Sequence, residues 1–269
     1  MFDRTDWAQF AEAAISVVGL VLLWQHALSA RGRERWKVRA LPEWSVTVTD
    51  FFTFLFFVLA FWFLGGVLGL LGTRPFTMTD DARVILQSTT SEFGMLAGVV
   101  IYALLHPGRF ALTKLEVSKS LRSGVVTYFI AAPIVFAAGA VWTTLLKVCG
   151  LPVEKQPAIE LFTRTKSPGW LGVLVLLAIV LAPMAEELIF RAGFFRYCRT
   201  RLPRWLAFVG PACLFAALHQ NLASFGQLVA LAIVFSYAYE RTGQIGTSMV
   251  AHGLFNLNTV VLLLLGINL

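Results

Sequence analysis

Charged residues are scarce in this chain: Asp, Glu, Lys and Arg make up 14% of its 269 residues, against roughly 25% in a typical soluble domain. Hydrophobic residues reach 58%. This composition excludes a soluble enzyme or a soluble binding domain, and it predicts a polytopic membrane protein. The fold class that follows is all-α, a transmembrane bundle of about eight helices.

Cysteine is scarce too, and its pattern excludes two kinds of site. Cys149, Cys198 and Cys213 are an odd number of cysteines without a CxxC pair, so neither a disulfide framework nor a thiolate metal site is indicated. The chain also lacks an internal repeat, which a transporter built from two related halves would usually show. The acidic start and the basic residues after the first apolar segment do not fit a cleavable signal peptide.

Long apolar segments are abundant. Eight of them are expected to cross or partly cross the membrane, and the sixth and seventh are the shortest. Their expected ranges are 11–28, 51–71, 84–105, 125–146, 170–195, 205–218, 225–239 and 245–265. The polar stretch 87–92 interrupts the third segment. We expect this helix to enter the membrane only near Phe93, with 87–92 wetted outside and without a functional role; the alternative is that they line a cavity.

Basic residues set the expected topology. Five of them follow the first apolar segment: Arg31, Arg33, Arg35, Lys37 and Arg39. The positive-inside rule places this loop in the cytoplasm, and alternation from there places both termini on the non-cytoplasmic side. Most other Lys and Arg residues then fall on the cytoplasmic side as well. Contact with anionic membrane lipids explains the net charge of +7, so no nucleic-acid partner is expected.

Five polar residues lie in apolar segments of the last third of the chain: Glu186, Glu187, His219, His252 and Asn256. Ionisable groups in lipid are costly unless they face the bundle interior and find partners, so they are functional candidates. Measured from the expected cytoplasmic helix ends at 1.5 Å per residue, Glu186, His219, His252 and Asn256 lie about 15, 21, 10 and 16 Å deep. This similar depth on three helices predicts one site.

Helical geometry separates the two glutamates. Glu187 and Arg191 are four residues apart and share a face, whereas Glu186 and Arg191 do not. We therefore expect Arg191 to neutralise Glu187, with Pro183 allowing a kink nearby. Taken alone, each segment also has a structural interpretation: an ion pair that seals a helix end, an interfacial histidine, or a polar pair that joins helices.

Three motifs occur in order on successive apolar helices: EExxxR at 186–191, FxxxH at 215–219 and HxxxN at 252–256. This order resembles the CPBP family of intramembrane proteases, which includes the type II CAAX prenyl endopeptidases and the Abi and lysostaphin resistance protein A-like proteins of bacteria. The resemblance covers 170–265, and Ala192 stands where many members have glycine. It implies two regions: 1–123 with the N-terminal helices and basic loops, and 124–269 with a catalytic helix bundle.

The resemblance implies hydrolysis of a peptide bond in a membrane-anchored or prenylated, CAAX-type protein, without a cofactor. Glu186 would be the general base and His219 would orient the same water, while His252 and Asn256 would stabilise the oxyanion. Supporting roles fall to Glu187 and Arg191, which tune the site, and to Phe215, which packs beneath His219.

Two alternatives to this function stay open. Glu186, His219 and His252 are also a ligand set that suits zinc with an open water position, which would give a metalloprotease. The other alternative is a membrane scaffold or immunity protein without catalytic activity. The expected location is a bacterial plasma membrane.

Overall fold

The computed structural model describes residues 4–35, 40–110, 112, 115–154 and 156–267, and these residues form helices joined by short loops. Within the described residues no strand is present. The helices, with π-helical segments written η, are α1 (Arg4–Leu23), η1 (Trp24–Leu28), α2 (Ala30–Arg35), α3 (Val48–Thr73), α4 (Asp80–Leu105), α5 (Val117–Val148), α6 (Pro157–Arg164), α7 (Pro168–Leu176), η2 (Leu177–Leu181), α8 (Ala182–Glu187), η3 (Leu188–Phe195), α9 (Arg196–Arg199), α10 (Arg204–Leu218), α11 (Leu222–Thr242) and α12 (Ile245–Leu264).

The expected polytopic bundle is confirmed. Seven of the described helices are long and apolar enough to cross a membrane. The expected sixth segment is the shorter apolar helix Arg204–Leu218, which at 15 residues and 1.5 Å per residue spans about 22 Å. The expected seventh segment is longer than its apolar run suggested, because α11 has 21 residues. All eight apolar segments are thus helical, and the chain is an integral, multi-pass membrane protein.

The polar stretch 87–92 lies within a regular helix. α4 is one continuous helix of 26 residues, capped at its start by the Thr79 hydroxyl, which accepts a hydrogen bond from the Ala82 amide. Within it, Thr89 and Thr90 donate their hydroxyl hydrogens to backbone carbonyls one turn earlier. Hydroxyl groups satisfied in this way are compatible with a membrane helix, and the helix Asp80–Leu105 as a whole is long and apolar enough to cross a membrane.

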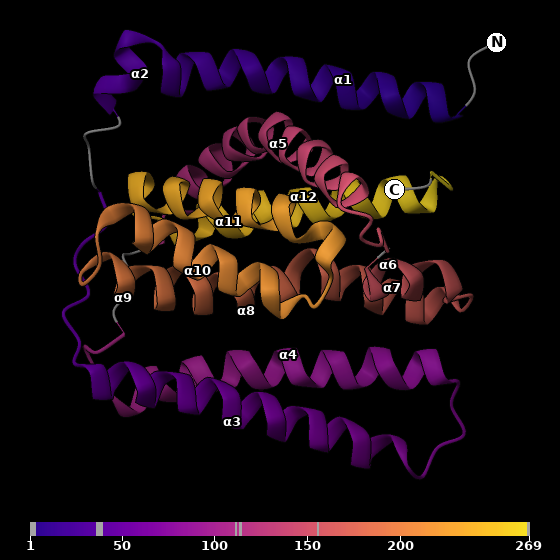
Figure 1. The fold of residues 1–269 in the computed structure, drawn as a ribbon. Coiled ribbons are helices and arrows are strands. Elements are labelled where there is room, and N and C mark those ends of the chain that lie inside the picture. Colours follow the sequence, from indigo (N-terminus) through magenta and orange to yellow (C-terminus); the bar gives the residue numbers. More distant parts are fainter. Residues whose placement is uncertain (1–3, 36–39, 111, 113–114, 155, 268–269) are drawn as a thin grey trace.

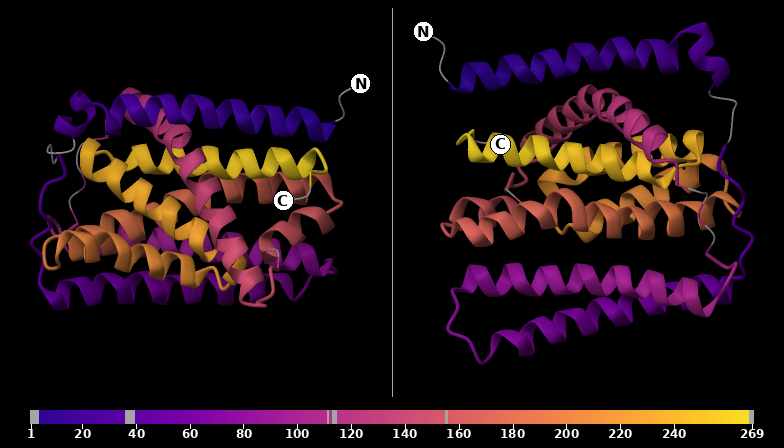
Figure 2. Two further views of the ribbon diagram at one scale, coloured as in Figure 1. Left: turned by 45° about the horizontal axis from the view of Figure 1, so that its top comes forward. Right: turned by 180° about the vertical axis from the view of Figure 1, so that it is seen from behind.

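The helices stack in layers. α1 lies on one flank of the bundle and the α3–α4 pair lies on the opposite flank, with the remaining long helices between them (Figure 1). The same order is seen from behind, in the right view of Figure 2. α1 packs on α5, and α5 packs on α11 and α12. α4 in turn contacts α7, η2 and α8, so the α3–α4 pair closes one side of the helix that carries the two glutamates.

Small residues bring α3 and α4 close together. A Cβ on Gly94 would lie 2.1 Å from the carbonyl oxygen of Phe61, and a Cβ on Gly98 would lie 2.6 Å from that of Phe57. Both contacts are too short for any side chain, so glycine is required here. Such close backbone approach drives helix association in lipid, where apolar burial between helices gives little advantage.

The bundle has two distinct ends. α1 begins and α12 ends at the same end, as both figures show. Arg31 and Arg33, which are exposed, follow η1 at the other end, and we call this other end the basic end. Of the remaining expected basic residues, Lys37, Arg39 and Lys114 lie outside the described residues.

Candidate functional site

The membrane span that carries the glutamates, Pro168–Arg199, is not a regular α-helix. Its α-helical pieces α7, α8 and α9 alternate with the π-helical segments η2 and η3. Pro183, near the start of α8, has no backbone N–H and so leaves carbonyl oxygens of the preceding turn without their donor. π-helical turns of this kind are frequent at functional sites. Here they flank Glu186 and Glu187 on both sides.

Glu187 and Arg191 form a completely buried ion pair, as their spacing predicted. Arg191 Nη1 lies 2.8 Å from Glu187 Oε1, and the two side chains are 1% and 0% exposed. The guanidinium also lies over the rings of Phe215 and Phe235, at 4.7 and 5.5 Å from their centroids. Cation–π contacts of this kind stabilise a charge that has left water.

His252 joins the two glutamates across helices. Its Nδ1 lies 2.9 Å from Glu187 Oε1, and its Nε2 lies 3.8 Å from Glu186 Oε2. An ionised carboxylate can only accept, so Nδ1–H donates to Glu187 and this bond fixes the orientation of the imidazole. Glu187 therefore has two partners, Arg191 and His252. Helical spacing within one segment could reveal only the first, because His252 is 65 residues away.

Glu186 is the less constrained of the two glutamates. Its side chain is 20% exposed, and its Oε2 atom is buried without a hydrogen-bond partner among the described residues. The 3.8 Å separation from His252 is longer than a hydrogen bond and suits a water molecule that both groups contact. Glu187 Oε2 is also buried without a hydrogen-bond partner among the described residues, but Oε1 of that residue is held by Arg191 and His252, whereas neither oxygen of Glu186 is held in this way.

Asn256 contacts the backbone next to Pro183. Its Nδ2 donates a hydrogen bond to the carbonyl oxygen of Ala178 at 2.8 Å. Ala178 precedes Pro183 by five residues, the spacing of a π-helical hydrogen bond, so Asn256 supplies a donor that proline lacks. Gly253 allows this approach, because a Cβ there would lie 2.6 Å from the carbonyl oxygen of Ile179. The second Nδ2 hydrogen of Asn256 is left for another acceptor.

His219 lies at the end of α10, as its C-cap residue. Its Nδ1 lies 2.8 Å from the carbonyl oxygen of Phe215, so this nitrogen is the donor and Nε2 is the acceptor. The rings of His219 and Phe215 have centroids 4.7 Å apart, and Phe215 also packs edge-on against His252. In the described structure His219 makes no hydrogen bond or ion pair with Glu186; Phe215 connects the two histidines.

One polar residue of this site was missed by sequence reasoning. Glu92, which the sequence analysis placed in water, lies on α4 facing the bundle, and its Oε2 atom is buried without a hydrogen-bond partner among the described residues. Electrostatic interaction couples it to Glu186. The position 13 residues before Leu105 puts it about 20 Å from the helix end, deep in a hydrocarbon core about 30 Å thick. A glutamate at that depth is a functional candidate, so the sequence alone could have identified it.

A metal site is not preformed in this arrangement. Within the part of the chain that the structure describes, no group of three or more His, Cys, Asp or Glu side chains is arranged to hold a metal ion. Of the three alternative zinc ligands, Glu186 and His252 are close together, while Nδ1 of His219 is bonded to the Phe215 carbonyl. This bond leaves Nε2 as the nitrogen through which His219 would bind a metal.

Comparison with known proteins points to one family. Residues 168–258 match the family model of the Type II CAAX prenyl endopeptidase Rce1-like proteins. The UPF0177 protein YbdI of Lactococcus lactis subsp. lactis (strain IL1403) is 27% identical over 110 residues, which are 40% of this chain and 58% of that protein. No solved structure matches the chain significantly.

The matched segment contains all three motifs, and the family that they resemble is thereby confirmed. The match over residues 168–258 and the likeness to YbdI both support the expected resemblance to the CPBP family of intramembrane proteases.

Proposed function

We propose that the chain is an intramembrane endopeptidase in which Glu186 activates water. One observation carries this proposal: a carboxylate oxygen of Glu186, buried and without a hydrogen-bond partner among the described residues, lies 3.8 Å from a histidine that Glu187 holds in position. A general base and an oriented proton donor at the same point are what amide hydrolysis requires. The family match supports a protease of the CAAX type.

The proposed reaction is peptide hydrolysis. Glu186 takes a proton from a water molecule, and the resulting hydroxide attacks the carbonyl carbon of the scissile bond. The carbonyl oxygen becomes an oxyanion, which accepts hydrogen bonds from Nε2–H of His252 and from the second Nδ2–H of Asn256. When the C–N bond breaks, the proton held by Glu186 passes to the leaving nitrogen. His252 can donate from both nitrogens when it is protonated.

His219 and Glu92 complete the proposed site. Nε2 of His219, the free acceptor of that ring, is proposed to orient the attacking water together with Glu186. Glu92 is proposed to contact the same water from α4, since its unpartnered oxygen faces the bundle and its carboxylate interacts with that of Glu186. The proposed substrate is a membrane-anchored or prenylated protein, because a site about 15–20 Å from a helix end is reached from within the bilayer more readily than from water.

The decisive experiment compares matched glutamate variants in proteoliposomes. The substrate is a peptide carrying a prenyl group and a fluorophore on each side of the scissile bond. We expect Glu186→Gln to lower kcat by about 10²- to 10⁴-fold, the usual contribution of a general base. Glu160→Gln, which changes an exposed glutamate of α6, should retain the wild-type rate.

Two other outcomes would favour the alternatives. If Glu186→Gln cleaves as fast as the wild type, Glu186 is not the base. If wild-type protein cleaves no prenylated or membrane-anchored peptide, while Glu186→Gln retains the cellular phenotype, the chain is a scaffold or immunity protein.

We propose that no metal takes part, and chelation decides this point. Activity that survives a strong chelator, in protein shown by elemental analysis to lack zinc, supports the glutamic mechanism. Loss of activity on chelation with recovery on added zinc supports the metalloprotease, with Glu186, His219 and His252 as ligands.

A further inference from the structure

A large cavity lies away from the candidate site, between η1, α5, α10 and α11. Its volume is about 1030 Å³, which is large enough for a lipid-sized ligand. None of Glu186, Glu187, His219, His252 and Asn256 lines it. The cavity is therefore separate from the proposed chemistry. We propose that it binds an anionic phospholipid of the surrounding membrane, with the phosphate at the basic end and an acyl chain in the interior.

The charge of the cavity wall favours an anion. Four of the described lining residues are Lys or Arg and none is Asp or Glu: Lys119, Arg122, Arg204 and Arg241. Arg204 is held by Glu240 at 2.8 Å, and Arg241 donates to the His26 carbonyl and to the Tyr237 hydroxyl. Lys119 and Arg122 have fewer contacts with neighbouring side chains.

Lys119 and Arg122 are the cations available to a phosphate. Lys119 forms an ion pair with Glu116 at 3.6 Å, but both side chains are about half exposed, so the pair is weak. Arg122 is exposed and has no ion-pair partner among the described residues. Basic pockets between transmembrane helices on one side of the membrane are typical sites for anionic lipid headgroups.

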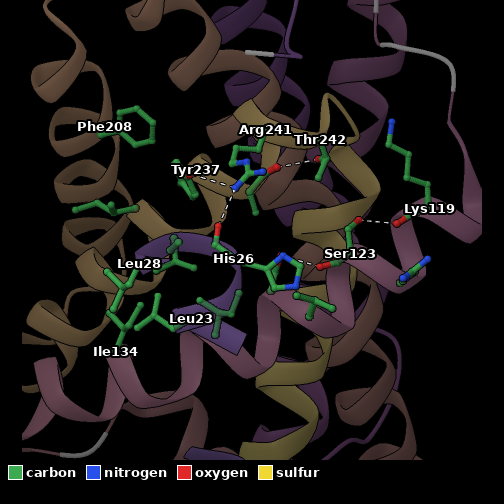
Figure 3. Close-up of a pocket in the computed structure, with 18 of the residues that line it drawn as sticks. Leu23, His26, Leu28, Lys119, Ser123, Ile134, Phe208, Tyr237, Arg241 and Thr242 are labelled. Atoms are coloured by element: carbon green, nitrogen blue, oxygen red, sulfur yellow. Dashed lines mark hydrogen bonds between the residues drawn. The ribbon is translucent and has the colours of Figure 1, made fainter. Parts of the chain in front are cut away.

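The polar and apolar parts of the cavity are separated along the membrane normal. The basic residues lie near helix ends: Arg204 begins α10, Lys119 is in the first turn of α5, and Arg241 is in the last turn of α11. Figure 3 shows Arg241 and Lys119 on one side of the cavity and Leu23 and Ile134 on the other. Ile134 follows Lys119 by 15 residues, so the wall is apolar to a depth of about 20 Å. A phospholipid likewise has a charged headgroup at one end and apolar acyl chains at the other.

The location of α1 gives the lipid a structural consequence. α1 packs against α5, and its continuation η1 supplies His26 and Leu28 to the cavity wall opposite α10 and α11. A lipid in the cavity would fill the space between η1 and these two helices. It would stabilise the attachment of the first helix to the rest of the bundle, because a ligand that binds only the folded state raises its stability.

Native mass spectrometry and thermal unfolding of the full chain test this proposal. The protein is purified in mild detergent and exchanged into phosphatidylglycerol or phosphatidylcholine with identical acyl chains. We expect phosphatidylglycerol, but not phosphatidylcholine, to be retained at one lipid per chain and to raise the Tm. Equal retention of both lipids, or retention of neither, would overturn the proposal.

Variants locate the binding site. Arg122→Gln should weaken phosphatidylglycerol retention about fivefold, the usual effect of one basic residue at a lipid headgroup. The matched control Arg31→Gln removes a positive charge from the same end of the bundle outside the cavity and should leave retention unchanged. Equal effects of the two substitutions would show attraction to the surface only and would contradict the proposal.

A second variant keeps the charge and fills the cavity. Ile134→Trp should abolish phosphatidylglycerol retention while circular dichroism shows unchanged helix content; if this variant does not fold, Val234→Trp, which changes a lining residue of α11, serves the same purpose. A prenylated peptide that displaces the lipid competitively would show that the cavity belongs to the substrate and would overturn the proposal. Peptidase activity is not needed for any of these measurements, so their failure would leave the proposed function untouched.

Discussion

At the scale of single residues, the site depends on a small network of buried charges. Glu187 forms an ion pair with Arg191 and accepts a hydrogen bond from His252, and Glu186 stays available for water. Removing one partner of a buried ion pair leaves an uncompensated charge, whereas replacing both partners by neutral residues of similar size is often harmless. The same network therefore positions His252 and determines how well the protein tolerates substitution.

A double-mutant cycle tests the Glu187–Arg191 pair. We expect Arg191→Met to lower the free energy of unfolding by about 3 to 5 kcal/mol, and Glu187→Gln to lower it by less because glutamine can still accept from His252. The double variant should be more stable than Arg191→Met alone. Unfolding in a denaturing detergent titration measures each free energy. Additive losses would show that the two side chains do not interact.

Glu92 gives a prediction that separates catalysis from folding. Glu92→Gln removes a carboxylate that is buried without a partner among the described residues, so the Tm should stay unchanged or rise. The kcat should fall at least tenfold while KM stays constant, and Glu92→Asp should recover part of the rate. Steady-state kinetics with the prenylated peptide measure both constants. Full activity of Glu92→Gln would remove Glu92 from the proposed site.

At the scale of secondary-structure elements, the span Pro168–Arg199 owes its shape to α12. Pro183 removes a backbone donor, and Asn256 supplies a donor to the Ala178 carbonyl. Gly253 lets the two helices approach closely enough for this bond. We therefore expect Asn256 both to stabilise the π-helical segment and to donate a hydrogen bond to the oxyanion.

The coupling between Pro183 and Asn256 is measurable. Asn256→Leu should lower the free energy of unfolding by about 1 kcal/mol, the typical worth of an interhelical hydrogen bond in lipid. In a Pro183→Ala background the restored backbone N–H can donate to the Ala178 carbonyl, so Asn256→Leu should lower the free energy of unfolding by less. Equal losses in both backgrounds would show that Asn256 does not compensate for the proline. Retained activity of Asn256→Leu would exclude its oxyanion role.

At the scale of the whole molecule, orientation in the membrane follows from the distribution of basic residues. The cavity cations Lys119, Arg122, Arg204 and Arg241 lie at the same end as Arg31 and Arg33. We propose that this basic end faces the cytoplasm of a bacterial cell and that both termini lie on the other side. The orientation determines the side from which the products leave.

A native cysteine reports on this orientation. Cys149 is exposed and caps α5 at the end opposite to Lys119 and Arg122. A membrane-impermeant maleimide added to spheroplasts, which lack the outer barriers of the cell, should label it, and Cys149→Ser should abolish the signal. Cys198, at the basic end in α9, should react only after the membrane is permeabilised. The reverse pattern would invert the proposed topology.

The sequence by itself determined the membrane class, the eight apolar helices and the Glu187–Arg191 pair. These features depend on hydrophobicity and on spacing within one helix, which are local properties of the chain. The same reasoning misplaced Glu92 because a polar stretch at the start of an apolar run looks like a helix end. The local sequence does not show that the hydroxyl groups of Thr89 and Thr90 bond to carbonyls of the same helix.

Only the tertiary structure decided which side chains meet. His252 contacts Glu187 from 65 residues away, Asn256 contacts the Ala178 carbonyl from 78 residues away, and Glu92 approaches Glu186 from another helix. These contacts depend on how each helix is rotated about its axis and how closely it packs. Both are set by glycines, π-helical turns and the shapes of neighbouring helices, so the geometry of the site and the lipid-sized cavity emerge only when the bundle is assembled.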